Sequence, residues 1–154
     1  MPLKGIPKVL TPNILHALSS MGHGDEIVLA DAHFPASSVA KSSNCGTIEI
    51  RADGCDTLPY LLESILKFFP LDEYAQEAIF LMDRVDSDKA SNLIVKVWKE
   101  FDQILELSQG KEIKPKFVER FQFYEQAKRA YAIIQTGDVA QYGNIILKKG
   151  LVMN

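Results

Sequence analysis

The sequence predicts one α/β domain in which helices cover both faces of a largely parallel or mixed sheet. Segments with helical spacing of apolar residues alternate along the whole chain with short apolar runs that are typical of buried strands. Crossover helices are how parallel neighbours in a sheet are joined. A chain of 154 residues with 47% hydrophobic content is also large enough to build a core without disulfides. We therefore expect a single three-layer α/β/α domain over residues 1–154.

The first predicted elements are a helix and a central strand. Thr11 and Pro12 are typical of an N-cap and a first helical position, and apolar residues then recur at helical spacing until Gly22. The run 27–30 is apolar throughout, which is expected of a strand that is covered on both faces. This strand should therefore lie inside the sheet.

The middle of the chain predicts two more strands with a helix between them. Residues 48–51 alternate between apolar and charged side chains, which indicates a half-exposed strand. Thr57 is expected to cap a helix that ends before Pro70. The apolar run 78–82 predicts a buried strand, so that Asp72 lies in a loop beside the sheet.

The last third predicts two helices followed by two strands. Residues 89–107 are expected to form one helix that ends near Gly110, and residues 116–130 keep helical spacing of aromatic and apolar side chains. Strands are expected at 132–134 and 144–147. This alternation completes the predicted α/β pattern.

Composition and charge exclude several classes of partner. The net charge is −3 and the basic residues are scattered, so we expect no nucleic-acid partner. No apolar run approaches the roughly 18 residues of a membrane span, and residues 1–7 lack the apolar segment of a signal peptide. Cys45 and Cys55 have no Cys or His at zinc spacing and are expected to be reduced thiols. We therefore expect a soluble, cytoplasmic protein with no membrane partner and no metal site.

The segment between Gly22 and Asp31 is the strongest candidate for chemistry. His23 stands between two glycines, which let the chain bend sharply and leave the imidazole open to a ligand. Taken alone, this pattern is more often an ordinary exposed turn. An extended strand would also place His23 more than about 15 Å from Asp31. Either the glycine loop folds back along the sheet, or the two residues contribute to a pocket shared between subunits.

Three ordered segments together resemble one family. They are residues 21–31, the stretch Arg-Phe-Gln-Phe-Tyr-Glu at 120–125, and the stretch that begins Tyr-Gly-Asn at 142–150. From about residue 3 to residue 152, the chain resembles the L-fucose mutarotase branch of the D-ribose pyranase and fucose mutarotase superfamily. The resemblance implies an isomerase that interconverts the α and β anomers of L-fucose or a similar monosaccharide without a cofactor. It also implies a three-layer α/β fold and a homo-oligomer in which neighbouring subunits complete each site.

The resemblance also implies roles for individual residues. His23 corresponds to the proton donor of the family. Sugar contacts are implied for Asp31, Asp72, Met82, Arg120, Tyr124, Tyr142, Gly143 and Asn144. Of these, Asp72 and Met82 correspond to a Pro-Leu-Asp segment and to the end of the following strand, which line the site in animal-type members.

These residue types suit the implied reaction. Anomer exchange needs one proton removed from the anomeric hydroxyl and another delivered to the ring oxygen, and an imidazole, with an unperturbed pKa of about 6.5, can do both near neutral pH. A general acid or base contributes on the order of 10²–10⁴ in rate, which suffices for a reaction that already proceeds in water. The carboxylates, the Arg120 guanidinium and the Asn144 amide offer donors and acceptors for sugar hydroxyls.

Structural explanations of the same residues stay open. Arg120 and Tyr124 share a face if both lie on a helix, but spacing alone favours Tyr124 as the polar edge of a core stripe with Phe117 and Phe121. Tyr142 can equally be an aromatic residue at a strand edge. Asp31 can likewise be a cap after a strand.

The other two histidines, His16 and His33, are interpreted as structural or surface residues. His33 and the longer segment 41–44 depart from the family pattern near the Asp31 loop, where they could alter sugar preference.

Two other functions stay open. A ribose pyranase is the alternative enzyme, since it uses the same ring-opening step. A monosaccharide-binding protein without catalysis is the alternative from another class, although a pure binder does not need His23.

Overall fold

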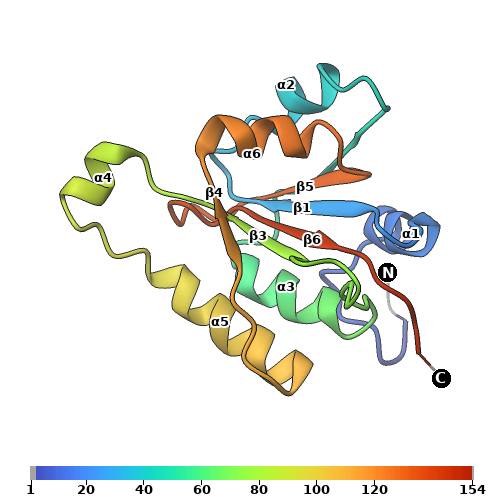
Figure 1. Ribbon diagram of the computed structural model, residues 1–154. Helices are drawn as coiled ribbons and strands as arrows, with labels where there is room; N and C mark the ends of the chain where they lie inside the picture. Colours follow the sequence, from blue (N-terminus) through green and yellow to red (C-terminus); the bar gives the residue numbers. More distant parts are fainter. Residues whose placement is uncertain (1–2, 154) are drawn as a thin grey trace.

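A mixed six-stranded sheet lies between two layers of helices in the computed structural model, which describes residues 3–153 (Figure 1). The strands are β1 (Glu26–Ala30), β2 (Ile48–Ala52), β3 (Ile79–Met82), β4 (Lys116–Val118), β5 (Ala132–Thr136) and β6 (Ile145–Lys148). The helices are α1 (Pro12–Ser20), α2 (Ala36–Lys41), α3 (Leu58–Leu66), α4 (Asp86–Ala90), α5 (Lys96–Gln109) and α6 (Arg120–Ala127). The predicted three-layer α/β class is confirmed. Residues 1, 2 and 154 lie outside the described residues.

The strand order is β2-β5-β1-β6-β3-β4, and within the described chain β6 alone runs antiparallel to its neighbours. Val28 at the middle of β1 pairs with Ile133 of β5 on one side and with Ile146 of β6 on the other. Since β1 is hydrogen-bonded on both sides and buried on both faces, the prediction of a central apolar strand is confirmed.

The core has two halves because side chains alternate across the sheet. Ile27 and Leu29 point into the cluster formed with α1, α3 and α5, whereas Val28 and Ala30 point into the cluster formed with α2 and α6. Figure 1 shows α3 and α5 on one side of the sheet and α2 and α6 on the other. Helix α4 projects beyond the sheet at the end where β3 leaves it.

The predicted helix 89–107 is wrong in its first part, because two helices with a break between them occupy this region. Its predicted end near Gly110 is confirmed, since Gly110 is the C-cap of α5. Helix α4 ends at Ala90, and Asn92 then adopts a φ of +53°. A residue in the left-handed region cannot continue a right-handed helix. The backbone N–H of Leu93 turns back to the carbonyl of Asp88 at 2.9 Å, and α5 starts only at Lys96.

The predicted helix 116–130 is wrong at its start. Residues 116–118 form β4, an edge strand in which Val118 pairs with Met82. Helix α6 follows, and the Glu119 carboxylate caps it by accepting hydrogen bonds from the first backbone N–H groups. The expected core stripe is wrong as well, since Phe117 and Phe121 are 47% and 66% exposed while Phe123 is fully buried. Helix α2 was not predicted.

Helix α3 is capped by a residue that sequence analysis does not single out. The expected cap, Thr57, makes no side-chain hydrogen bond to the helix. Asp138 lies in the connection between β5 and β6, and its Oδ2 accepts from the Leu58 backbone N–H at 2.7 Å. Its Oδ1 accepts from the Ala140 N–H at 2.8 Å. This carboxylate therefore joins α3 to the connection that carries the C-terminal motif.

Asp138→Ala is expected to lower the free energy of unfolding by about 1–3 kcal/mol, because two N–H groups lose their partner, one of them buried. Urea titration measures this change. Thr57→Ala is the matched control, and we expect it to leave the free energy of unfolding within about 0.5 kcal/mol of wild type. Equal losses for the two variants would contradict the assignment of Asp138 as the cap.

Within residues 3–153, no helix combines the length and the apolar character that crossing a membrane requires.

Candidate functional site

The antiparallel direction of β6 places distant parts of the chain at one edge of the sheet. The carboxyl ends of β1 and β3 meet the start of β6 there, and α6 begins at the same edge after β4. The connection 137–144 crosses the end of β1, where the Ala32 N–H donates to the Asp138 carbonyl at 2.7 Å. Ligands of open α/β sheets commonly bind at such carboxyl ends. We call this edge the carboxyl edge.

A cleft of about 280 Å³ opens at the carboxyl edge. Six of the predicted site residues line it: Asp31, Met82, Arg120, Tyr124, Tyr142 and Asn144. Gly143, which was also predicted, is not among the lining residues. A Cβ at this position would approach the Ala140 carbonyl oxygen to 3.2 Å and the Asp31 Cβ to 3.6 Å. Residues that are up to 113 positions apart in the sequence are thus brought to one place.

Asp31 and Asn144 form a reciprocal pair at the bottom of the cleft. The Asp31 N–H donates to Asn144 Oδ1 at 3.0 Å, and Asn144 Nδ2 donates to Asp31 Oδ2 at 2.9 Å. Both residues are buried, at 3% and 4% exposure. Burial raises the pKa of the Asp31 carboxyl, while the His33 N–H and the Asn144 amide oppose the rise. The pair therefore fixes both side chains in orientation while the remaining lone pairs of the carboxylate can accept from a ligand.

Arg120 and Tyr124 lie on one face of α6, as the spacing predicts. The Arg120 Nε donates to the Tyr124 hydroxyl at 3.0 Å. The Tyr124 ring also packs edge-on against Phe34, with ring centroids 5.4 Å apart. Tyr124 therefore both packs against the core and lines the cleft. The exposed guanidinium of Arg120 keeps further N–H donors available for a ligand.

His23 and Asp72 lie at the opposite edge of the sheet, which we call the amino edge. Their loops are both attached to the end of β6: the Gly24 N–H donates to the Lys149 carbonyl at 2.8 Å, and the Asp72 N–H to the Lys148 carbonyl at 3.0 Å. His23 Nε2 is 3.1 Å from Asp72 Oδ1. The glycine loop therefore does not fold back toward Asp31.

The Asp72 carboxylate is held as an acceptor. The Tyr74 N–H, at 2.9 Å, and then the His23 ring lower the pKa of the carboxyl group, against the opposing effect of burial. A charged partner at Nε2 favours the imidazole form that carries its proton there and leaves Nδ1 free to exchange protons. The His23 side chain is 42% exposed, so solvent or a neighbouring molecule can reach it.

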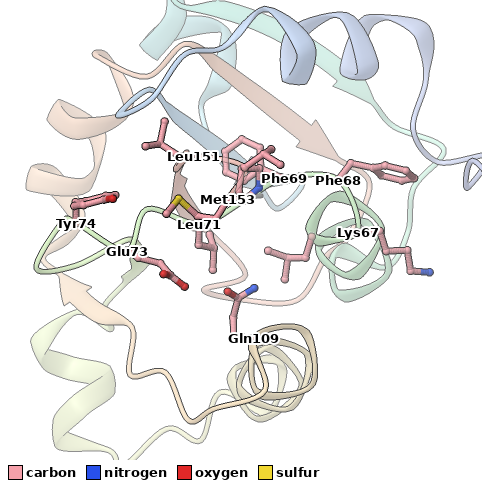
Figure 2. A pocket seen from close by; sticks show the side chains of 12 residues that line it. Lys67, Phe68, Phe69, Leu71, Glu73, Tyr74, Gln109, Leu151 and Met153 are labelled. Atoms are coloured by element: carbon pink, nitrogen blue, oxygen red, sulfur yellow. The ribbon is translucent and has the colours of Figure 1, made fainter.

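A larger cavity of about 670 Å³ lies close to this pair but contains none of the predicted site residues (Figure 2). Figure 2 shows Leu151 and Met153, from the C-terminal segment, beside Phe69 and Leu71, with Tyr74 at the side. The Tyr74 ring lies edge-on to the His23 ring at a centroid distance of 6.0 Å. Nine of its twelve lining residues are apolar or aromatic, and its polar side chains are those of Lys67, Glu73 and Gln109.

Five further residues line the cleft: His33, Phe34, Val85, Asp88 and Gln141. His33 is exposed, as expected, and follows Asp31 directly. Asp88 lies in α4, six residues beyond the carboxyl end of β3, and no sequence pattern singles it out. Within residues 3–153, no group of three or more His, Cys, Asp or Glu side chains is arranged to hold a metal ion.

Residues 4–152 match the family model described as the RbsD / FucU transport protein family. The chain belongs to this family. It is 54% identical over 148 residues to a fucose mutarotase of Mus musculus, a match that covers 96% of this chain and 94% of the mouse protein. It is 44% identical to an L-fucose mutarotase of Haemophilus influenzae strain PittGG, over 97% of this chain and 96% of that protein.

Among solved structures of the RbsD/FucU type, a fucose mutarotase from Streptococcus pneumoniae in complex with L-fucose superimposes with a TM-score of 0.85. It is 44% identical to this chain, and the match covers 98% of this chain and all of the other. The sequence-based resemblance is thereby confirmed at the level of the family.

Proposed function

We propose that this protein is a cofactor-independent isomerase that interconverts the α and β anomers of L-fucose. The observation that carries the proposal is the match, over nearly the whole chain, to a fucose mutarotase solved with L-fucose. We place the reaction in the cytoplasm, where the two free thiols, Cys45 and Cys55, would stay reduced.

The cleft at the carboxyl edge suits a monosaccharide. Its volume of about 280 Å³ is at the small end of the range for ligand sites, roughly 300–1,000 Å³. Asp31 supplies acceptors, Arg120 supplies donors, and the Met82 side chain adds an apolar wall. A sugar with several hydroxyls and one methyl group uses all three kinds of contact.

The reaction moves two protons and breaks and remakes one C–O bond. A proton leaves the anomeric hydroxyl, the bond between the anomeric carbon and the ring oxygen breaks, and the ring oxygen receives a proton. The resulting aldehyde rotates about its C1–C2 bond, and closure reverses the steps with no net change of protons or electrons. We assign the proton transfer at the ring oxygen to His23, whose Nε2 is held by Asp72 at 3.1 Å. Protonated at Nδ1 as well, the ring gives this proton to the ring oxygen on opening and takes it back on closure.

His23 must come from a neighbouring copy of the chain. It lies at the amino edge, whereas the cleft lies at the far end of β1, about 15 Å or more away along the strand. A homo-oligomer in which the amino edge of one subunit covers the cleft of the next brings the two together. This is the shared pocket that the sequence analysis left as one of two arrangements.

Exposed apolar side chains lie beside both half-sites, which are the pair of His23 and Asp72 at the amino edge and the cleft at the carboxyl edge. These side chains support the proposed assembly. At the amino edge, Tyr74 is 71% exposed, and Val152 and Met153 are 80% and 69% exposed. Next to the cleft, Phe121 is 66% exposed. Apolar groups clustered in this way commonly mark protein interfaces. A second copy is therefore the occupant that we assign to both surfaces.

Magnetisation exchange between the anomeric protons of L-fucose, with and without the protein, tests the proposed function. Catalysis should raise the exchange rate above that of the free sugar at micromolar protein. Equal acceleration of pyranose–furanose exchange in D-ribose would favour a ribose pyranase. Saturable binding of L-fucose without acceleration would leave only a monosaccharide-binding protein.

A further inference from the structure

Helix α4 contributes one side chain to the cleft. None of its five residues is buried, and Asp88 is the one that is not fully exposed. The Tyr142 hydroxyl donates to Asp88 Oδ2 at 2.5 Å. Asp88 also lines the cleft at the carboxyl edge. The polar helix that projects from the sheet in Figure 1 thus reaches the candidate site through a carboxylate.

The backbone and the side-chain hydroxyl of Tyr142 are both held in place. Its backbone has a φ of +57°, a conformation that costs energy for a residue with a Cβ and persists when its surroundings enforce it. Its carbonyl accepts from Trp98 Nε1 at 3.0 Å. Its hydroxyl accepts from the Val85 N–H at 3.2 Å while donating to Asp88. The hydroxyl therefore has a defined hydrogen-bonding direction.

A phenol hydroxyl has one proton and two lone pairs. In Tyr142 the proton is committed to Asp88, and one lone pair is committed to Val85. Burial, followed by the bond to Asp88, raises the pKa of Tyr142, so the hydroxyl keeps its proton. The group that remains for a ligand is a single lone pair, which can accept a hydrogen bond but has no proton to give.

We infer that Asp88 is a positioning residue that makes the Tyr142 hydroxyl an obligate acceptor and so selects which part of the sugar faces it. This inference rests on the proposed function. A sugar hydroxyl can donate to Tyr142, whereas the ring oxygen has no proton and is repelled by another acceptor. Asp88 thereby disfavours orientations with the ring oxygen toward Tyr142 and leaves that oxygen for the proton donor.

Four variants test this inference on L-fucose exchange: Asp88→Ala, Asp88→Asn, Tyr142→Phe and the double variant Asp88→Ala/Tyr142→Phe. Asp88→Ala should raise KM about tenfold with a much smaller change in kcat, and Asp88→Asn, whose amide oxygen still accepts, should recover most of this loss. The double variant should have the KM of Tyr142→Phe within about twofold, because Asp88 acts through the hydroxyl. Asp86→Ala, on the exposed side of α4, is the matched control and should leave KM unchanged.

Sugars with one hydroxyl replaced by fluorine give a readout that a purely structural role would not move. Fluorine accepts weakly and cannot donate, so at the position that faces Tyr142 the substitution should raise KM strongly in wild type. In Asp88→Ala the freed phenol proton can turn toward the fluorine, and the penalty at that position should shrink several-fold.

Three outcomes would overturn the inference. KM losses that multiply in the double variant would show that Asp88 contacts the sugar directly. An Asp88→Asn variant as impaired as Asp88→Ala would show that charge, rather than the hydrogen bond, matters. Fluorine penalties that Asp88→Ala leaves unchanged would show that Tyr142 is not directed by Asp88. If the wild-type protein does not accelerate anomer exchange of L-fucose, the proposed function itself is contradicted, and this inference with it.

Discussion

Replacement of His23 by alanine is expected to lower the rate of L-fucose anomer exchange by a factor on the order of 10² or more, because the general acid and base of the proposed mechanism is lost. The fold should stay intact. The His23 side chain is 42% exposed, hydrogen-bonds Asp72 and lies edge-on to the Tyr74 ring, so little packing energy depends on it.

Magnetisation exchange measures the rate, and far-ultraviolet circular dichroism verifies the fold. His16→Ala is the matched control, since His16 is an exposed histidine on α1 at a position that the proposed mechanism does not use. A His23→Ala variant that exchanges L-fucose as fast as wild type would refute the assignment of the proton donor. An unfolded variant would show that His23 is structural.

Mixing two impaired variants is expected to restore activity if each site is built from two chains. His23→Ala chains retain a complete cleft, and Arg120→Ala chains retain the pair of His23 and Asp72. After random exchange of subunits, about a quarter of the sites combine an intact cleft with an intact histidine from the neighbour. The mixture should therefore reach about a quarter of the wild-type exchange rate, well above either variant alone.

The control mixture combines His23→Ala with Asp72→Ala. Both substitutions affect the amino edge, so no pairing of these chains produces a complete site, and the rate should stay at the level of the unmixed variants. Recovery in this control, or its absence in the first mixture when subunit exchange is verified by mass spectrometry, would rule out a site shared between chains.

The interior of the fold was predictable because its elements follow from local patterns. The apolar run of β1, and the alternation that marks β2, are visible in a single sequence because burial on one or both faces dictates residue type. The same rule gave a wrong prediction at 116–118. Phe117 and Phe121 are spaced as on one face of a helix, but both side chains are exposed and residues 116–118 form a strand. Exposed aromatic residues carry no information on which period the backbone follows.

The family motifs predicted six of the residues that line the cleft, but not how these residues are arranged. Family motifs singled out Asp31 and Asn144, but their reciprocal hydrogen bonds depend on the connection 137–144 crossing β1, which no local pattern reveals. Strand geometry predicted that an extended path would separate His23 from Asp31, but it left open whether the glycine loop folds back. Asp88 was missed because its position depends on the break at Asn92, a single backbone conformation.

Strand β6 connects the two edges of the sheet and therefore sets the span between the two half-sites. Asn144 precedes its first residue, and Lys149, whose carbonyl anchors the His23 loop, follows its last. An inserted residue would lengthen this span by about 3.3 Å and shift the register against both neighbours. In the proposed homo-oligomer, the fit between neighbouring subunits would then change at every contact. Length variation should accordingly be rejected in these four residues.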